Sequence, residues 1–390
     1  MPSIYLGHKA FVEAGHEVLF AVPGPRARTY LYDGIQVREF RLPVPIVPQR
    51  YLWLHRLSLK VRWLAFLVVG TIIGLRLGRR FRPDVVYGQF YPAAPVAWLL
   101  GRIWKIPNIT RMYGTFLFPY LHSWLGRLRK FDELLAFKIP CNYFIMTNDG
   151  TQGGDCATAL GMPPARLRLW RNGVDLGMYD PDPDPAEVKN DLAIPCDHKL
   201  ILALSRLDSW KRVDRVITAL PAVVQRYEQT TAVIVGDGED RAALEALARR
   251  LGVEQNVRFV GMVKHDRVAR FLNAADIFVS LYDLSNAGNP LLEALCCGKC
   301  IVSLDNGATR EVIPNEDIGI LLPVGQLDTL PDVLVALLRD DAWRRRLGEA
   351  ARARALATMQ SWEQRMTMEV RLIEDLVRSA AGPSGWAREV

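Results

Sequence analysis

Residues 200–238 read LILALSRLDSWKRVDRVITALPAVVQRYEQTTAVIVGDG, and this stretch contains two strand patterns separated by one helix pattern. Residues 200–204 and 231–235 are short apolar runs of strand length. Between them, Val213, Val216 and Leu220 recur at helical spacing. Two strands joined by a helix form a right-handed crossover between parallel neighbours. The stretch therefore predicts a βαβ unit.

The same alternation of strand and helix continues on both sides of this unit. Further strand patterns lie at 18–22, 85–87, 109–112, 143–146, 257–260, 277–281 and 301–304. Such alternation is typical of an α/β fold with parallel sheets. A domain usually holds about 100–200 residues, so a chain of 390 residues favours two domains. We expect Rossmann-like domains over 1–170 and 171–362, and a flexible tail over 382–390.

The first domain begins without an opening strand. A doubly wound domain normally opens with a strand and a tight loop. Here, the chain opens with Met1 to Tyr5 and runs directly into a helix pattern that ends at Gly15, before the strand pattern 18–22. Either the fold starts differently or the sequence lacks its first strand. We favour the second interpretation.

The net charge of +7 and the pI of about 9.1 suit an anionic partner. A nucleotide diphosphate, a lipid phosphate, a membrane surface and a nucleic acid all fit this description. The basic residues are dispersed and no recognised nucleic-acid module is present, which disfavours nucleic acid. We therefore expect no nucleic-acid partner.

The apolar segment 63–75 is too short to span a bilayer, which takes about 20 apolar residues. We interpret it as a helix packed in the core. A helix lying on a membrane is the open alternative, because Arg56, Lys60 and Arg62 form a basic flank.

The six cysteines have no regular spacing, so we expect reduced thiols in a cytosol. Cys296, Cys297 and Cys300 superficially resemble a metal site. No second pair of cysteines or histidines accompanies them, and they lie where a helix end meets a buried strand. We therefore expect core packing there and no metal.

Arg206 and Lys211 lie in the loop after the strand pattern 200–204. Open α/β sheets bind ligands beyond the carboxyl ends of their strands. A guanidinium and an ammonium group there suit a diphosphate and could neutralise the charge on a departing nucleotide. Two solvated surface charges are an equally weighted interpretation.

Two glycine-containing loops could lie beside the same ligand. Gly236 and Gly238 follow a strand pattern, where they allow close approach of a ligand, although a plain tight turn is the more common explanation. Residues 285–293 read SNAGNPLLE. In that loop we expect Asn289 to be a helix N-cap, Pro290 the first helical residue and Glu293 a first-turn carboxylate able to accept ribose hydroxyls. Simple stabilisation of the helix terminus is the alternative.

In the first half, Tyr113, Gly114 and Thr115 follow the strand pattern 109–112 and could face an acceptor, or could be structural.

Taken together, these segments resemble the retaining GT-B glycosyltransferases of family 4 from about Gly15 to Trp362. The matches are sharpest between Arg171 and Ile313. They comprise Asn172-Gly173-Val174-Asp175, Ser205-Arg206-Leu207 with Lys211, Val235-Gly236-Asp237-Gly238, Val257 to Gly261, Ala275 to Val279, Glu293-Ala294 with Gly298, and Ser361-Trp362. Each piece is weak, but their shared order and spacing are specific.

The resemblance implies two facing Rossmann-like domains, with the acceptor in the first, the donor in the second and a C-terminal helix, about 363–381, returning to the first. It implies a hexosyltransferase that uses a nucleotide-diphosphate sugar, retains the anomeric configuration and needs no metal or other cofactor. By this likeness, Arg206 and Lys211 hold the diphosphate and Glu293 the ribose. The remaining donor contacts would come from Gly236, Gly238, Ser285, Asn286, Gly288 and Asn289.

The resemblance also implies an acceptor that is a saccharide or a lipid-linked precursor of a surface polysaccharide or glycolipid. We expect a cytoplasmic protein, with the inner face of an anionic membrane as a further partner. Two departures from the family bear on activity. Ser285 stands where the family has the first of two glutamates, and Tyr113 where a histidine is common. A degenerate GT-B protein that binds nucleotide or a partner without catalysis is therefore the second interpretation, and a sugar-nucleotide epimerase a third.

Overall fold

The computed structural model describes residues 2–48, 51–179 and 184–381. Contacts within the chain divide it into two compact units. Unit 1 comprises Met1–Thr147, Gln152–Arg171 and Trp362–Val390, and unit 2 comprises Asn148–Thr151 and Asn172–Ser361. The predicted tail, 382–390, lies outside the described residues.

Unit 2 is built on one parallel sheet of six strands in the order β10-β9-β8-β11-β12-β13. The strands are β8 (Lys199–Leu204), β9 (Thr230–Val235), β10 (Val257–Gly261), β11 (Ile277–Ser280), β12 (Cys300–Asp305) and β13 (Ile320–Pro323). The helices are α7 (Pro185–Asp191), α8 (Val213–Arg226), α9 (Arg241–Arg250), α10 (Val268–Ala274), α11 (Asn289–Cys296), α12 (Thr309–Val312), α13 (Leu330–Arg339) and α14 (Asp341–Thr358). The α/β fold expected from the sequence is confirmed, and β13 was not predicted.

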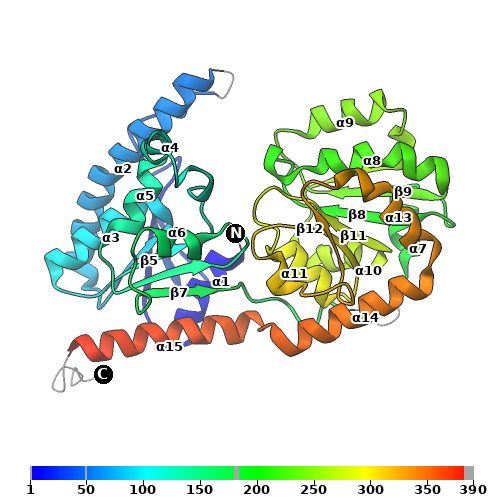
Figure 1. The fold of residues 1–390 in the computed structure, drawn as a ribbon. Helices are drawn as coiled ribbons and strands as arrows, with labels where there is room; N and C mark the ends of the chain where they lie inside the picture. Colours follow the sequence, from blue (N-terminus) through cyan, green and yellow to red (C-terminus); the bar gives the residue numbers. More distant parts are fainter. Residues whose placement is uncertain (1, 49–50, 180–183, 382–390) are drawn as a thin grey trace. The chain divides into compact units, whose positions relative to one another are not determined.

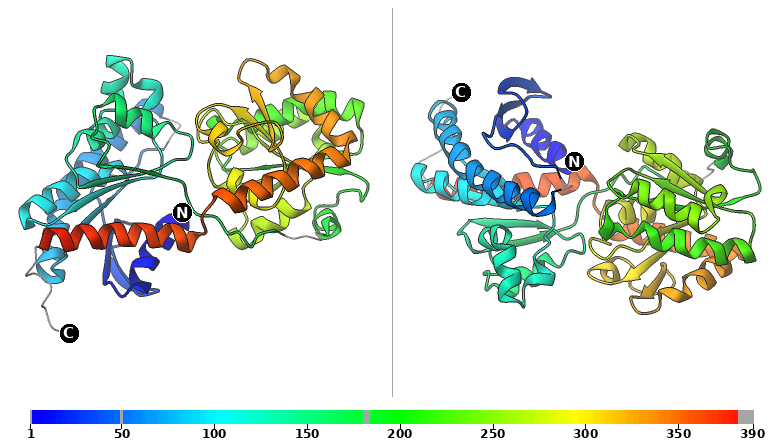
Figure 2. Two further views of the ribbon diagram at one scale, coloured as in Figure 1. Left: turned by 60° about the horizontal axis from the view of Figure 1, so that its bottom comes forward. Right: turned by 90° about the horizontal axis from the view of Figure 1, so that it is seen from above.

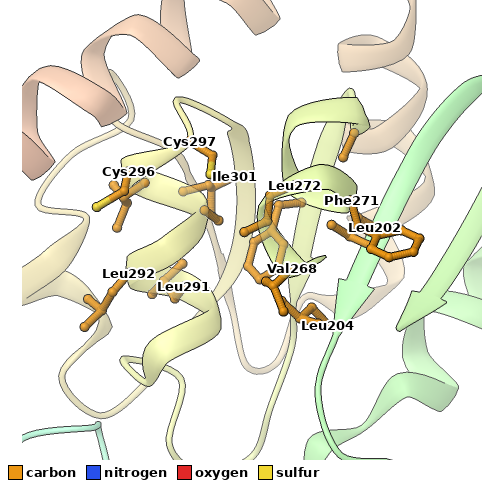
Figure 3. Packing of buried hydrophobic residues seen from close by; sticks show 14 of the residues in the cluster. Leu202, Leu204, Val268, Phe271, Leu272, Leu291, Leu292, Cys296, Cys297 and Ile301 are labelled. Atoms are coloured by element: carbon orange, nitrogen blue, oxygen red, sulfur yellow. The ribbon is translucent and has the colours of Figure 1, made fainter. Parts of the chain in front are cut away.

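Helices cover both faces of this sheet, as Figure 1 shows. On one face, Val216, Leu220 and Val223 of α8 are buried in a cluster that also contains residues of α9 and α13. On the other face, α10 and α11 pack against β8 and β12 (Figure 3). Cys296 and Cys297 belong to that second core, and all six cysteines are free. Two packed faces explain why the strands read as continuous apolar runs.

Unit 1 contains two separate sheets. β1 (Val18–Pro23) pairs in parallel with β3 (Ile35–Phe40), which pairs antiparallel with β2 (Arg28–Tyr32). The second sheet is parallel and consists, in this order, of β4 (Val86–Gln89), β5 (Asn108–Met112), β6 (Tyr143–Thr147) and β7 (Leu167–Trp170). The helices are α1 (Pro2–Glu13), α2 (Leu52–Phe81), α3 (Phe90–Trp104), α4 (Trp124–Arg129), α5 (Phe131–Lys138), α6 (Gly153–Ala159) and α15 (Trp362–Ala381). The sequence patterns missed β2, β3 and β7.

β1 and β4 are each an edge strand, and no described strand joins them. A cavity of about 2310 Å³ lies between these edges. Both strands line it, together with residues of α1, α2 and α15. The absence of an opening strand stays a prediction. The cavity is relevant to it because it lies between two strand edges that no described strand joins.

The C-terminal helix α15 returns to unit 1, as expected. Ile373 of α15 is buried with Ile109 of β5 and Ile145 of β6. Figures 1 and 2 show this helix, in red, lying along unit 1. Apolar packing on the sheet therefore fixes α15 in place.

The interpretation of 63–75 as a core-packed helix is wrong, because most of this helix is not buried. The segment belongs to α2, which has 30 residues, and Trp53–Phe81 is long and apolar enough to cross a membrane. Only 17% of its apolar window is buried. Trp63 is buried against Phe131, but Leu64 and Val68 are 54% and 61% exposed. The arginines near its end obscured the length of this helix in the sequence.

Candidate functional site

The site in unit 2 lies where the strand order reverses. From β8 the chain builds the sheet outward to β9 and β10, then returns to β11 on the other side of β8. Loops that leave two such neighbours diverge, and the crevice between them is the usual ligand site of an open α/β sheet. Arg206 and Lys211 follow β8, and Ser285 follows β11. These three sequence-predicted residues therefore lie at one edge of the unit 2 sheet.

The side chain of Lys211 packs against two aromatic rings at this crevice. Lys211 ends the short helix η2 (Ser209–Lys211) and is only 9% exposed. Its Nζ lies 4.1 Å from the ring centroid of Trp210 and 3.9 Å from that of Tyr282. Burial lowers the pKa of Lys211 to about 7, although the charge of Asp149 opposes this effect. An anion bound beside Lys211 would favour its charged form.

Arg206 differs from Lys211 in its environment. Its side chain is 73% exposed and forms an ion pair with Asp208. It is nevertheless close enough for its charge to contribute to the lowered pKa of Lys211. Arg206 is therefore a surface cation at the mouth of the crevice, and Lys211 is the buried one.

Gly236 and Gly238 shape the loop that carries these cations. A side chain at Gly236 would overlap the carbonyl oxygen of Ser205, and one at Gly238 would overlap that of Leu207. The Leu207 amide donates to the carbonyl of Asp237 at 3.0 Å. Both glycines thus permit close contact between two protein loops, which is the tight-turn alternative considered from the sequence.

The loop after β11 is fixed by internal hydrogen bonds. Asn286 is buried, accepts from the amide of Tyr282 at 2.9 Å and donates to its carbonyl at 2.7 Å. Asn289 accepts from the Asn172 side chain at 2.8 Å. The N-cap of α11 is Gly288, and Asn289 is already helical. The expectations that Asn289 caps this helix, that Pro290 is its first residue and that Glu293 lies in its first turn are therefore wrong, because the helix starts one residue earlier.

Ser285 adopts a left-handed backbone conformation, with φ of 62°. Such a conformation is uncommon for residues other than glycine and is often found at functional sites. Its Oγ donates to Oδ2 of Asp149 at 2.7 Å. Asp149 was not singled out from the sequence. The turn signal Asn148-Asp149-Gly150 after the strand pattern 143–146 could have drawn attention to it.

Glu293 is buried on α11 and is 5% exposed. Burial, and secondarily the charge of Asp175, raise its pKa to about 8. Nδ1 of His265 lies 3.9 Å from Oε1 of Glu293, and this histidine was also missed. Near neutral pH Glu293 is mostly an uncharged acid, able to donate as well as accept a hydrogen bond.

Among the described residues no group of three or more histidines, cysteines, aspartates or glutamates could hold a metal ion. The crevice instead offers the charges of Lys211 and Arg206. These groups can bind an anionic ligand and stabilise a departing phosphate.

The acceptor-side candidates belong to unit 1. Tyr113 donates to Gln89 at 2.7 Å and stacks on the guanidinium of Arg111, and burial raises its pKa to about 12. Thr115 is buried and donates to Glu133 at 2.8 Å. Gly114 has φ of 112°, which favours glycine. Thr115 has an internal structural contact, whereas Tyr113 lines the large cavity.

A buried ionic network lies beside Tyr113 and was not foreseen. Glu369 of α15 accepts from Arg365 at 2.7 Å, lies 3.6 Å from Arg111 and is hydrogen-bonded by Tyr87. The two guanidinium groups help to hold the pKa of Glu369 below its usual value despite its burial. The network fastens α15 to the sheet of unit 1.

Comparison with known proteins assigns the chain to a family. The family model for "Glycosyl transferases group 1" matches residues 184–354, and that for "Glycosyl transferase 4-like domain" matches residues 8–173. The chain belongs to the group 1 glycosyltransferases with the GT-B fold.

Two curated relatives are about 30% identical to this chain over the regions that align. N-acetyl-alpha-D-glucosaminyl L-malate synthase of Bacillus anthracis is 31% identical over 43% of this chain and 44% of its own length. The GDP-mannose-dependent alpha-(1-6)-phosphatidylinositol monomannoside mannosyltransferase of Mycobacterium tuberculosis is 29% identical over 73% of this chain and 74% of its own. The match thus spans less than half of the first relative and about three quarters of the second.

Solved structures share the fold at lower identity. Sucrose-phosphate synthase of Thermosynechococcus elongatus has a TM-score of 0.77 and 19% identity, over 96% of this chain and 93% of that one. WaaG, a glycosyltransferase of lipopolysaccharide biosynthesis, has a TM-score of 0.72 and 19% identity over 95% of both chains. HepE of Anabaena, in complex with UDP and glucose, has a TM-score of 0.67 and 20% identity over 89% of this chain and 87% of that one.

Proposed function

We propose that this chain transfers a hexose from a nucleotide-diphosphate sugar to a saccharide or lipid-linked acceptor, with retention of the anomeric configuration. Family membership supports sugar transfer, and relatives named as GDP-mannose-dependent or solved with UDP support a nucleotide-linked donor. The structural observation that carries the proposal is the buried Lys211 between Trp210 and Tyr282 at the switch point of the unit 2 sheet.

The chemistry proposed for this crevice is stabilisation of the leaving group. When the bond between sugar and diphosphate breaks, negative charge grows on the phosphate oxygens. Lys211, and Arg206 at the mouth, would neutralise that charge, so the reaction would need no metal. A transfer rate unchanged by a metal chelator supports this part of the proposal, and a rate abolished by the chelator and restored by a divalent cation contradicts it.

Glu293 is proposed to hold the ribose of the nucleotide. As a buried acid with a pKa of about 8, it can both donate to one hydroxyl and accept from another. The backbone amides at Gly288 and Asn289 would meet the sugar. Attack by the acceptor on the face vacated by the leaving group would retain the configuration, and an NMR assignment of the product anomer tests this.

A membrane-bound acceptor is supported by the surface of α2 and α4. Trp53 of α2 is 70% exposed, and Trp124 and Leu128 of α4 are 74% and 66% exposed. The basic residues Arg56, Arg127 and Arg129 are exposed on the same two helices. Tryptophan, leucine and arginine together favour the interface of an anionic bilayer. Sedimentation with anionic vesicles that weakens with salt supports this placement at the inner face of a membrane, and no sedimentation at low salt contradicts it.

The donor site is tested first by thermal unfolding with UDP, GDP, ADP and their hexose derivatives. A ligand at about 100 times its dissociation constant stabilises its site by about 2.7 kcal/mol. We expect one nucleotide series to raise the melting temperature, and the Arg206→Ala variant to reduce that shift. The absence of any shift with the folded chain contradicts the proposal.

A second function, nucleotide or partner binding without catalysis, is favoured by Ser285 at the place of the family's first glutamate. A nucleotide-dependent shift in melting temperature without release of free nucleoside diphosphate, across a panel of acceptors, supports this alternative. Release of nucleoside diphosphate coupled to formation of a glycosylated product removes it.

A further inference from the structure

Residues 148–151 contact three segments beside the proposed donor crevice of unit 2, at Glu311, Ala287 and Gly307. The Asn148 side chain donates to Glu311 at 2.9 Å. A side chain at Gly150 would lie 3.1 Å from the Ala287 amide nitrogen, and one at Gly307 would lie 2.5 Å from the Gly150 carbonyl. The backbone at Gly150, directly after Asp149, is therefore in close contact with the loops after β11 and β12. The side chain of Asp149 is correspondingly restricted in where it can point.

The carboxylate of Asp149 is oriented by hydroxyl donors. Oδ1 accepts from Oγ1 of Thr151 at 2.7 Å and from the Thr151 amide at 3.2 Å. Oδ2 accepts from Ser285 Oγ at 2.7 Å. Two carboxylate oxygens offer about four acceptor positions, so these three bonds leave Oδ2 able to accept one more. Burial raises the pKa of Asp149, while these hydrogen bonds and the charge of Lys211 lower it.

Ser285 and Asp149 together bring a carboxylate to a part of the crevice where the loop after β11 offers only a hydroxyl. A serine hydroxyl at position 285 is too short and too weak an acceptor to hold a sugar as a carboxylate does. Its strained backbone conformation instead aims the hydroxyl at Asp149. The carboxylate beside Ser285 therefore comes from the loop that carries Asp149, 136 positions away in the sequence.

We propose that Asp149 is the residue that grips the transferred sugar, accepting a hydrogen bond from one of its hydroxyls while Ser285 and Thr151 hold the carboxylate in position. This inference rests on the proposed function, because it presumes a nucleotide-sugar donor in the crevice. Asp149 determines specificity for the sugar and makes no contact with the nucleoside.

The test compares Asp149→Asn with the unsubstituted full chain by calorimetric titration. The probes are UDP and GDP without sugar, and UDP-glucose and GDP-mannose with it. A hydrogen bond to a charged group contributes about 1.5–3 kcal/mol, so the variant should bind the nucleotide sugar about 10- to 100-fold more weakly. Its affinity for the sugar-free nucleotide should fall much less, because there only the charge that Asp149 places near Lys211 is lost. Asp155→Asn, the same change at an exposed carboxylate of α6 in unit 1, is the matched control.

Three results overturn the role of Asp149. They are an equal loss for nucleotide and nucleotide sugar, no loss for either, and the same selective loss in Asp155→Asn. If the unsubstituted chain binds no nucleotide at all, the proposed function itself fails, and the assignment of Asp149 fails with it. Melting temperatures of the variants within about two degrees of the parent show that a loss of affinity is not a loss of folding.

Discussion

The ammonium group of Lys211 lies 3.9 Å from the centroid of the Tyr282 ring, and Tyr282 in turn donates to the carbonyl of Leu204 at 2.7 Å. This chain of contacts links the end of β8 to the loop after β11, the two sides of the switch point. A cation is thereby held in an apolar wall before any anion arrives. The arrangement makes the protonation of Lys211 sensitive to what binds beside it.

The first prediction concerns the pH dependence of donor binding. In the free protein the pKa of Lys211 is about 7, and a bound diphosphate would raise it. Protonated Lys211 binds the anion better, so affinity should fall as pH rises above 7, by up to about tenfold per pH unit. Titration with UDP or GDP between pH 7.5 and 9 measures this, since the phosphate itself is almost completely ionised there. Lys211→Met should bind weakly at every pH, and a flat profile for the parent chain would contradict the assignment.

The second prediction concerns Glu293 and stability. Its folded-state pKa is about 8, above its ordinary value of 4.5. Between these values the unfolded chain has released the proton that the folded chain keeps, so stability falls with rising pH, by up to about 1.4 kcal/mol per unit. Glu293→Gln should remove this slope and be the more stable protein at pH 8, yet bind nucleotide less tightly. Denaturant unfolding at pH 5 and 8 tests it, and equal slopes for the variant and the parent chain would count against it.

The third prediction concerns the close contact of loops at Gly236. Its φ is 133°, and an added side chain would overlap the Ser205 carbonyl. Gly236→Ala should therefore destabilise the fold by more than about 2 kcal/mol. Gly325→Ala is the control, because nothing lies within 4 Å of its added methyl group. Similar melting temperatures for the two variants would refute the contact.

The fourth prediction concerns the exposed face of α2. Leu64 is 54% exposed and Val68 is 61% exposed. The double variant Leu64→Glu with Val68→Glu therefore places two carboxylates on this exposed face. Binding to anionic vesicles should fall at least tenfold, while nucleotide binding in unit 2 stays unchanged. Leu31→Glu with Tyr32→Glu, at residues of β2 that are 69% and 56% exposed, adds two carboxylates elsewhere in unit 1. Equal vesicle binding by all three proteins would show that α2 is not the membrane contact.

The sequence predicted the sheet of unit 2 well because buried parallel strands leave continuous apolar runs. It missed β2, whose five residues are all exposed and carry no such pattern. The cations after β8 could be found, since the chemistry of a ligand site is concentrated in loops after strands. Asp149 could not be tied to Ser285, because only the folded chain brings the two together. Glu293 was found, but its altered pKa depends on burial that no local pattern records.

The unpaired edges of β1 and β4 have a consequence for how this chain aggregates when it is partly unfolded. β1 reads VLFAVP and β4 reads VYGQ, with no charge in either. An uncharged strand edge is a template on which a second molecule can add its own strand. These edges line a cavity, and local unfolding of unit 1 would make them accessible. Aggregation should therefore start from unit 1, and a nucleotide that stabilises only unit 2 would leave the rate of aggregation unchanged.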